Sequence, residues 1–221
     1  MSFITDAALY YAAEPHQDAA WEALWASLDA STQETFTTAY RASPEPSTDN
    51  PLKVEFFSQN DNKSGTGYRE CFSSSCAMLA GYFGKVKSDD EYNVIRSRYG
   101  DSTDANAQVQ ALESLGLTAK FITTGSVDDL KAEIDSGRPV AVGWLHKGSV
   151  SYPSGGGHWT VVIGYYSDGV YMNDPNGEAD LVNGGYTSNY NGACLKYSYN
   201  NWLPRWDVEG HYSGWYLTCS D

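Results

Sequence analysis

The spacing of apolar residues predicts helical structure at the start of the chain. Over residues 3–42 the apolar side chains recur at the three-to-four-residue spacing of an amphipathic helix. They include Ala19, Ala20, Leu24 and Leu28. Ser31 followed by Glu34 has the form of a capping box and predicts the start of a second helix. We therefore expect a small N-terminal helical hairpin over residues 1–45.

A proline-rich stretch separates this region from the rest of the chain. Residues 43–51, SPEPSTDNP, hold three prolines among Ser, Thr and Asp residues. Proline removes a backbone donor and clashes with the preceding helical turn, so a helix cannot continue through this stretch. The sequence therefore predicts a second domain over residues 52–221.

The second region begins with a predicted strand followed by predicted helices, which is typical of a fold with both α and β elements. LKVEFFSQ, residues 52–59, predicts a short strand, and a polar loop containing glycine follows it. CFSSSCAMLAGYFG predicts a helix that starts near Cys71, with Gly84 suited to its C-terminal turn. Two further helices are expected over residues 88–98 and 104–115.

Strand patterns dominate the remaining sequence. Residues 117–123 predict a strand and residues 127–134 a short helix, after which PVAVGWLH, HWTVVIGYYS and GVYMNDP predict consecutive strands. Residues 176–212 show little periodicity, and GWYLTC is expected to be a closing strand. The fold class is therefore α+β, with a helical layer packed on a mostly antiparallel sheet.

Composition narrows the set of partners. The 28 acidic and 14 basic residues give a formal net charge of -14, which disfavours nucleic acid and anionic membrane surfaces. No stretch approaches the roughly 20 apolar residues of a membrane span, and the N-terminus lacks the features of a signal peptide. We expect a soluble monomer that is made in the cytoplasm without membrane insertion.

Four cysteines are too few for a disulfide scaffold and lack the paired spacing of a zinc site. Cys71 lies at a predicted helix start, where free amides and the helix dipole favour a thiolate. Cys76 falls inside the same helix among apolar residues and is expected to fill space. Cys194 and Cys219 either pair in an oxidising compartment or remain free thiols.

A base for the thiol is expected on a different element. His158 follows three glycines and opens a predicted strand, and Asp174 ends the next strand, where its carboxylate could orient the imidazole. The other histidines, His16, His146 and His211, are interpreted as structural or surface residues. Each candidate taken alone is a common feature, whereas the combination is less common.

These segments resemble a known family. CFSSSCAMLAGYFG is similar to the cysteine segment of the bacteriocin-processing, double-glycine peptidases, a papain-like family, and HWTVVIGYYSDGVYMNDP is similar to its histidine and aspartate segment. The resemblance implies a catalytic triad of Cys71, His158 and Asp174, with Gln59 of FFSQNDN as the oxyanion donor. Phe72 and Ser73 depart from the Gly-Pro that often follows the family's cysteine.

The chemistry implied by this resemblance is acyl transfer through a thiolate, which requires no metal or organic cofactor. Two loops hold oxygen ligands that could bind a cation, NDNKSG from Asn60 and DPNGEAD from Asp174, although solvated turns explain both.

The sequence leaves three functions open. AAEPHQDAAWEALWASL resembles helical modules of phage and bacterial wall-lytic enzymes, which favours a lysin that cuts peptidoglycan stem or cross-link peptides in the periplasm or cell wall. A peptidase for a protein or leader peptide is the alternative. A non-catalytic binding or structural protein on the same scaffold is the third.

Overall fold

The computed structural model describes residues 27–33 and 51–221 of a chain that divides into two compact units, Met1–Ser47 and Thr48–Asp221. In the first unit, residues 30–33 are helical, and the Asp29 carboxylate accepts a hydrogen bond from the Thr32 amide at 2.9 Å. Asp29 therefore caps this turn, and the prediction that Ser31 precedes the helix is wrong. The other residues of the hairpin predicted over 1–45 lie outside the described residues.

Three helices form one layer of the second unit, and all three were predicted. They are α4 (Cys71–Tyr82), α5 (Asp89–Arg96) and α6 (Ala105–Ser114). Ser88 and Asp104 cap α5 and α6 by accepting backbone amides of the first turn. Most of α4 is buried, because it lies between the other two helices and the sheet.

A six-stranded antiparallel sheet has the order β1-β8-β2-β3-β4-β7. Its strands are β1 (Thr118–Gly125), β2 (Val140–Lys147), β3 (Ser154–Tyr166), β4 (Gly169–Asn173), β7 (Leu195–Ser198) and β8 (Gly214–Ser220). The predicted strands at β1 to β4 and the closing strand β8 are confirmed. So is the short helix, α7 (Val127–Asp135).

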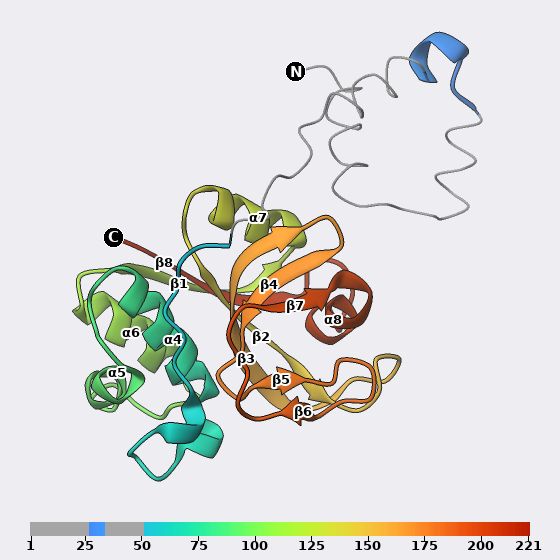
Figure 1. The fold of residues 1–221 in the computed structure, drawn as a ribbon. Coiled ribbons are helices and arrows are strands. Elements are labelled where there is room, and N and C mark those ends of the chain that lie inside the picture. Colours follow the sequence, from blue (N-terminus) through green and yellow to red (C-terminus); the bar gives the residue numbers. More distant parts are fainter. Residues whose placement is uncertain (1–26, 34–50) are drawn as a thin grey trace. The chain divides into compact units, whose positions relative to one another are not determined.

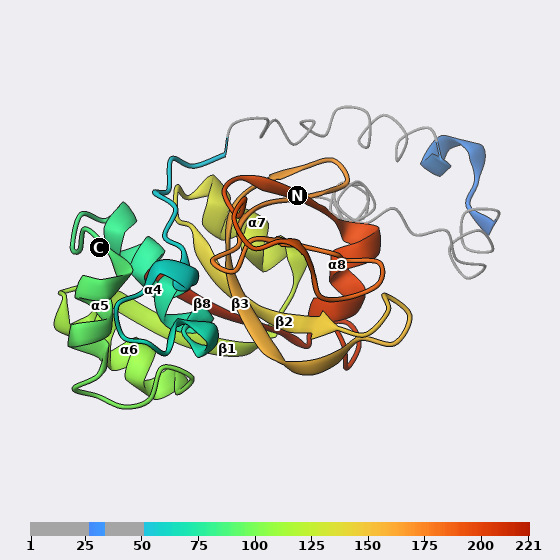
Figure 2. The same ribbon diagram turned by 60° about the horizontal axis from the view of Figure 1, so that its bottom comes forward.

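The sheet separates two apolar cores. Along β3, Trp159 and Val161 face the layer of α4 to α6, whereas Thr160 and Val162 lie on the other face, which α7 and α8 (Tyr199–Trp206) cover. Figures 1 and 2 show the two helical groups on opposite sides of the sheet. The expected α+β architecture, with helices packed on a mostly antiparallel sheet, is confirmed.

The strand predicted over residues 52–59 does not form. A bulge at Ile163 in the β3–β4 pairing leaves its carbonyl free, and this carbonyl accepts the Leu52 amide at 2.7 Å. Beyond that bond the neighbouring strands are already paired with each other, so the segment crosses the domain without joining a ladder. It ends in a 3₁₀ turn, η1 (Gln59–Asp61), and a second turn, η2 (Gly67–Arg69), precedes α4.

Residues 176–212 contain more structure than their pattern indicates. Besides β7 and α8 they form a two-stranded ribbon of β5 (Glu178–Ala179) and β6 (Tyr186–Ser188). These elements are short and depend on buried anchors in α8, where Trp202 and Trp206 stack with ring centroids 5.0 Å apart. Cys194 is exposed and Cys219 is buried, and both are free thiols. None of the helices in the described residues could cross a lipid bilayer.

Candidate active site

Cys71 is the first residue of α4 and is half-buried. The preceding residue, Glu70, is only 2% exposed. Its carboxylate accepts hydrogen bonds from Asn62 Nδ2, Ser64 Oγ and Thr66 Oγ1, each at 2.8 Å. Glu70 thereby folds the polar loop that leads to Cys71, a role that the sequence did not reveal.

His158 of β3 and Asp174, the residue after β4, form a buried pair. Val161 of β3 lies opposite Asn173, the last residue of β4, so the chain beyond β4 comes alongside His158. His158 Nε2 lies 2.7 Å from Asp174 Oδ1, and the two residues are 4% and 0% exposed. The structure thus brings together the two residues that the sequence placed at successive strand ends.

Further donors hold the Asp174 carboxylate in place. Tyr197 Oη donates to Asp174 Oδ2 at 3.1 Å, and the Asn176 amide donates to Oδ1 at 2.9 Å. Tyr197 belongs to β7, in the region without clear periodicity, so sequence analysis missed it. These bonds keep Oδ1 directed at the imidazole.

The electrostatic balance favours a charged imidazole. Burial lowers the pKa of His158, but the charge and hydrogen bond of Asp174, followed by the interaction with Cys71, raise that pKa to about 10. Because Asp174 occupies Nε2, Nδ1 is the nitrogen that is left to face the Cys71 thiol. His158 is therefore positively charged at neutral pH.

Aromatic rings surround the imidazole. Trp144 and Tyr186 meet His158 edge-on, with centroids 5.4 and 5.6 Å away, and the His146 ring lies 5.5 Å away. Burial, followed by the charge of His158, lowers the pKa of His146 to about 4, so His146 is neutral at pH 7. His146 lies beside the candidate site because Trp144, two residues earlier, pairs with His158 across β2 and β3.

His211 lies on the surface. His211 is exposed, with its Nδ1 3.5 Å from a carboxylate oxygen of Asp207. His16 lies outside the described residues. The expectation of a surface position therefore holds for His211.

Gln59 is 3% exposed and is held at both its backbone and its side chain. The backbone N–H of Gln59 donates to the carbonyl of Pro175 at 2.9 Å, which ties Gln59 to the residue after Asp174. Its Nε2 donates to the carbonyl of Gly67 at 2.9 Å, which leaves the second N–H of that amide for another acceptor. A Cβ at Gly67 would lie 2.1 Å from the Gln59 carbonyl oxygen, so only glycine permits this approach.

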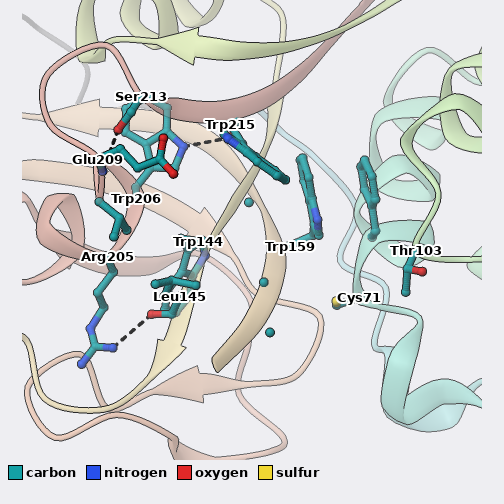
Figure 3. A pocket seen from close by; sticks show the side chains of 15 residues that line it. Cys71, Thr103, Trp144, Leu145, Trp159, Arg205, Trp206, Glu209, Ser213 and Trp215 are labelled. Carbon is teal, nitrogen blue, oxygen red and sulfur yellow. Dashed lines mark hydrogen bonds between the residues drawn. The ribbon is translucent and has the colours of Figure 1, made fainter. Parts of the chain in front are cut away.

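Cys71 lies at the edge of a cavity of about 510 Å³ (Figure 3). Gly156 and Gly157, just before His158, line it, and a Cβ at either position would meet no atom within 4 Å. Phe72, which departs from the expected glycine, stacks on Trp159 with centroids 3.7 Å apart. That departure therefore builds the cavity wall and displaces none of the candidate catalytic groups.

In the loop from Asp174, one of the two considered for a cation, both aspartate carboxylates are engaged by the protein itself. Asp174 is engaged as above, and Asp180 accepts the amides of Val182 and Asn183. Over residues 27–33 and 51–221, no cluster of His, Cys, Asp and Glu side chains is arranged to hold a metal ion.

Comparison with known proteins identifies the family. The model of the Peptidase_C39 like family matches residues 51–207, which is most of the chain. The chain belongs to this family. It is therefore a cysteine peptidase with a papain-like fold, and the resemblance seen in the sequence is confirmed at this level. None of the curated proteins matches it.

Three solved structures are similar to this C39-like peptidase. A double glycine motif protease from an AMS/PCAT transporter, in complex with the leader peptide, is 19% identical with a TM-score of 0.47, over 78% of this chain and 94% of that one. A putative C39-like peptidase from Bacillus anthracis is 15% identical with a TM-score of 0.48, over 78% and 98%. The peptidase domain of Streptococcus ComA, a bi-functional ABC transporter, is 17% identical with a TM-score of 0.46, over 69% and 92%.

Proposed function

We propose that Cys71 is the nucleophile of this cysteine peptidase, His158 its proton carrier and Asp174 the group that orients His158. The observation that carries the proposal is the 2.7 Å contact between His158 Nε2 and Asp174 Oδ1, together with the interaction of the Cys71 side chain with the same imidazole. That arrangement leaves an imidazolium facing the sulfur, which is the environment that stabilises a thiolate.

The cycle that follows uses only protein groups and water. The Cys71 thiolate attacks the amide carbonyl, and the oxyanion accepts the second Nε2–H of Gln59 and the backbone N–H of Cys71, which is free of helical bonds at the first residue of α4. His158 Nδ1 gives its proton to the leaving nitrogen as the C–N bond breaks. Water, deprotonated by His158, then hydrolyses the thioester and restores the ion pair.

For the substrate we propose peptides of bacterial peptidoglycan, cut in the stem or cross-link as a lysin would cut them. Tyr68, three residues before Cys71, is 80% exposed, and Tyr190 is 89% exposed. Tyr190 follows Asn189, whose carbonyl accepts Asn60 Nδ2 at 3.2 Å, next to Gln59. Exposed rings on the two loops that adjoin the site offer faces on which the sugar rings of a glycan strand can pack.

A protein or leader peptide is the competing substrate, since the first of the similar structures was solved with a leader peptide bound. The peptidoglycan hypothesis and the leader-peptide hypothesis involve the same chemistry at Cys71. They differ in whether sugars beside the cleft contribute to binding.

The test compares purified sacculi with soluble peptides, including one with a double-glycine motif. Wild type, Cys71→Ala and Cys194→Ser are assayed for loss of turbidity and for new amines, and the fragments are identified by mass spectrometry. We expect wild type and Cys194→Ser, which changes an exposed thiol outside the site, to clear sacculi while Cys71→Ala does not.

Two other results would change the conclusion. Cleavage of soluble peptides without any effect on sacculi would overturn the wall substrate and leave the catalytic assignment intact. Full activity of Cys71→Ala would overturn the assignment of the nucleophile.

A further inference from the structure

The cavity beside Cys71 has an aromatic wall that extends well beyond the reacting atoms. Four indole rings line it, those of Trp144, Trp159, Trp206 and Trp215. Figure 3 shows Cys71 and Trp159 on one side and Trp206, Glu209 and Ser213 on the other. Trp206 Nε1 donates to the carbonyl of Trp215 at 2.9 Å, which joins α8 to β8 at the outer end.

Arg205 is the cation among the described residues that line this cavity, and four of the five N–H groups of its guanidinium donate to backbone carbonyls. The residue is 0% exposed. Its nitrogens donate to backbone carbonyls on two segments. The acceptors are Leu181 at 2.8 Å, Leu145 at 3.1 Å, Lys147 at 3.2 Å and Gly148 at 2.8 Å. Arg205 therefore supports the wall, and its burial keeps its charge away from a ligand.

Glu209 has the opposite properties. It is exposed, and within the described part of the chain no hydrogen bond or ion pair engages its carboxylate. Its turn is nevertheless well fixed, because Ser213 Oγ receives the Glu209 amide at 3.1 Å and donates to Asp207 Oδ1 at 3.0 Å. The ligand-accessible charge of this cavity is therefore a carboxylate at its rim.

We propose that the outer end of the cavity is a subsite for an amine-bearing side chain close to the scissile bond, with Glu209 as the residue that selects it. An aliphatic stem would lie along the indole rings, and its ammonium would meet an indole face and the Glu209 carboxylate. The ligand class is a lysine or another diamino acid within a peptide. This proposal rests on the proposed function, since it makes the cavity the place where the substrate binds.

The test measures binding and does not require turnover. In a Cys71→Ala background, the indole N–H signals of Trp206 and Trp215 are followed by NMR during titration with Nα-acetyl-lysine methylamide. The norleucine and glutamate methylamides, which remove or reverse the charge, are titrated alongside. We expect the lysine compound to bind about fivefold more tightly than norleucine, which is the scale of one partly solvated ion pair.

Two variants isolate the carboxylate. Glu209→Gln should abolish the preference for lysine over norleucine, whereas Glu113→Gln should keep it. Glu113 is an exposed residue at the end of α6, away from the cavity, and this substitution makes the same change in net charge. Equal binding of lysine and norleucine to the Cys71→Ala protein, or a preference that survives in Glu209→Gln, would overturn the proposal.

The amine can come from a protein or from the cell wall, and a further pair of ligands separates these sources. L-alanyl-γ-D-glutamyl-L-lysine carries the linkage of a wall stem peptide, and the α-linked Ala-Glu-Lys carries that of a protein. Tighter binding of the γ-linked form supports a wall source, and tighter binding of the α-linked form supports a protein source. A Glu209-dependent lysine preference combined with inert sacculi would retain the subsite and reject the wall substrate.

Discussion

The raised pKa of His158 predicts a specific dependence of stability on pH. A group whose pKa is higher in the folded than in the unfolded chain stabilises the fold below the unfolded pKa, here 6.5, and loses that contribution as the pH rises toward the folded value of about 10. The perturbation that tests this is Asp174→Asn. It removes the charge that opposes burial and keeps a side chain of the same shape.

The experiment requires a Cys71→Ala background. In wild type the proton on His158 can come from the Cys71 thiol, and such a transfer does not change the number of protons that the folded protein binds. The pH dependence of stability, which follows that number, would then not report on His158. In Cys71→Ala, each pH unit above 6.5 then costs up to about 1.4 kcal/mol of stability. Between pH 6.5 and 8.5 the expected loss is about 1–2 kcal/mol, because removal of Cys71 also removes its share in raising the pKa of His158. In Cys71→Ala/Asp174→Asn the buried imidazole is neutral throughout, so we expect almost no change from His158.

Urea unfolding followed by tryptophan fluorescence at pH 6.5, 7.5 and 8.5 measures both proteins, and NMR titration of the His158 ring provides a direct check. Contributions from other groups, such as the thiols of Cys76 and Cys219 whose pKa values burial raises, are common to both proteins and cancel in the difference. Parallel pH profiles for the two proteins would refute the assignment of the raised pKa to Asp174.

Three other substitutions test the supports of the site. Gly67→Ala should reduce kcat by about 10- to 100-fold by displacing Gln59, and unchanged kcat would contradict an oxyanion role for its amide. Tyr197→Phe should cost about 1–3 kcal/mol in urea unfolding, because Asp174 loses a donor and the Ala179 amide loses its acceptor. Arg205→Met should cost about 3 kcal/mol or more by leaving buried carbonyls unpaired, and a near-neutral effect would show that water replaces the guanidinium.

The sequence was informative wherever a local signal decides the structure. The helix that begins at Cys71 carries a long apolar run and a glycine at its end, and Gly84 has the expected positive φ of 72°. His158 lies in β3 and Asp174 directly follows β4, and the two strands have strong β-propensity and a short connection, so antiparallel pairing alone brings the two residues close. The candidate triad could therefore be predicted before any coordinates were known.

Long-range contacts account for what could not be predicted. Residues 52–59 have the composition of a strand, but whether they pair depends on free carbonyls elsewhere, and only the two ends of the segment meet one, at Ile163 and at Pro175. Tyr197 and Arg205 gain their roles from partners far away in the sequence, and neither stands in a recognisable motif. The closeness of His146 to the site could not be predicted either, because its ring packs against Tyr186 of a ribbon that has no periodic signal.

The bulge at Ile163 has an evolutionary consequence. Side chains along β3 alternate between the two faces of the sheet, and before the bulge this alternation sets the face on which His158 lies. At the bulge the alternation shifts by one residue, so odd- and even-numbered residues exchange faces after it. A residue gained or lost between His158 and the bulge would turn the imidazole to the wrong face, whereas removal of Ile163 itself would leave that face intact. Among relatives of this peptidase, length differences between the histidine and the aspartate should therefore occur at the bulge or in the turn over residues 167–168, and almost nowhere else.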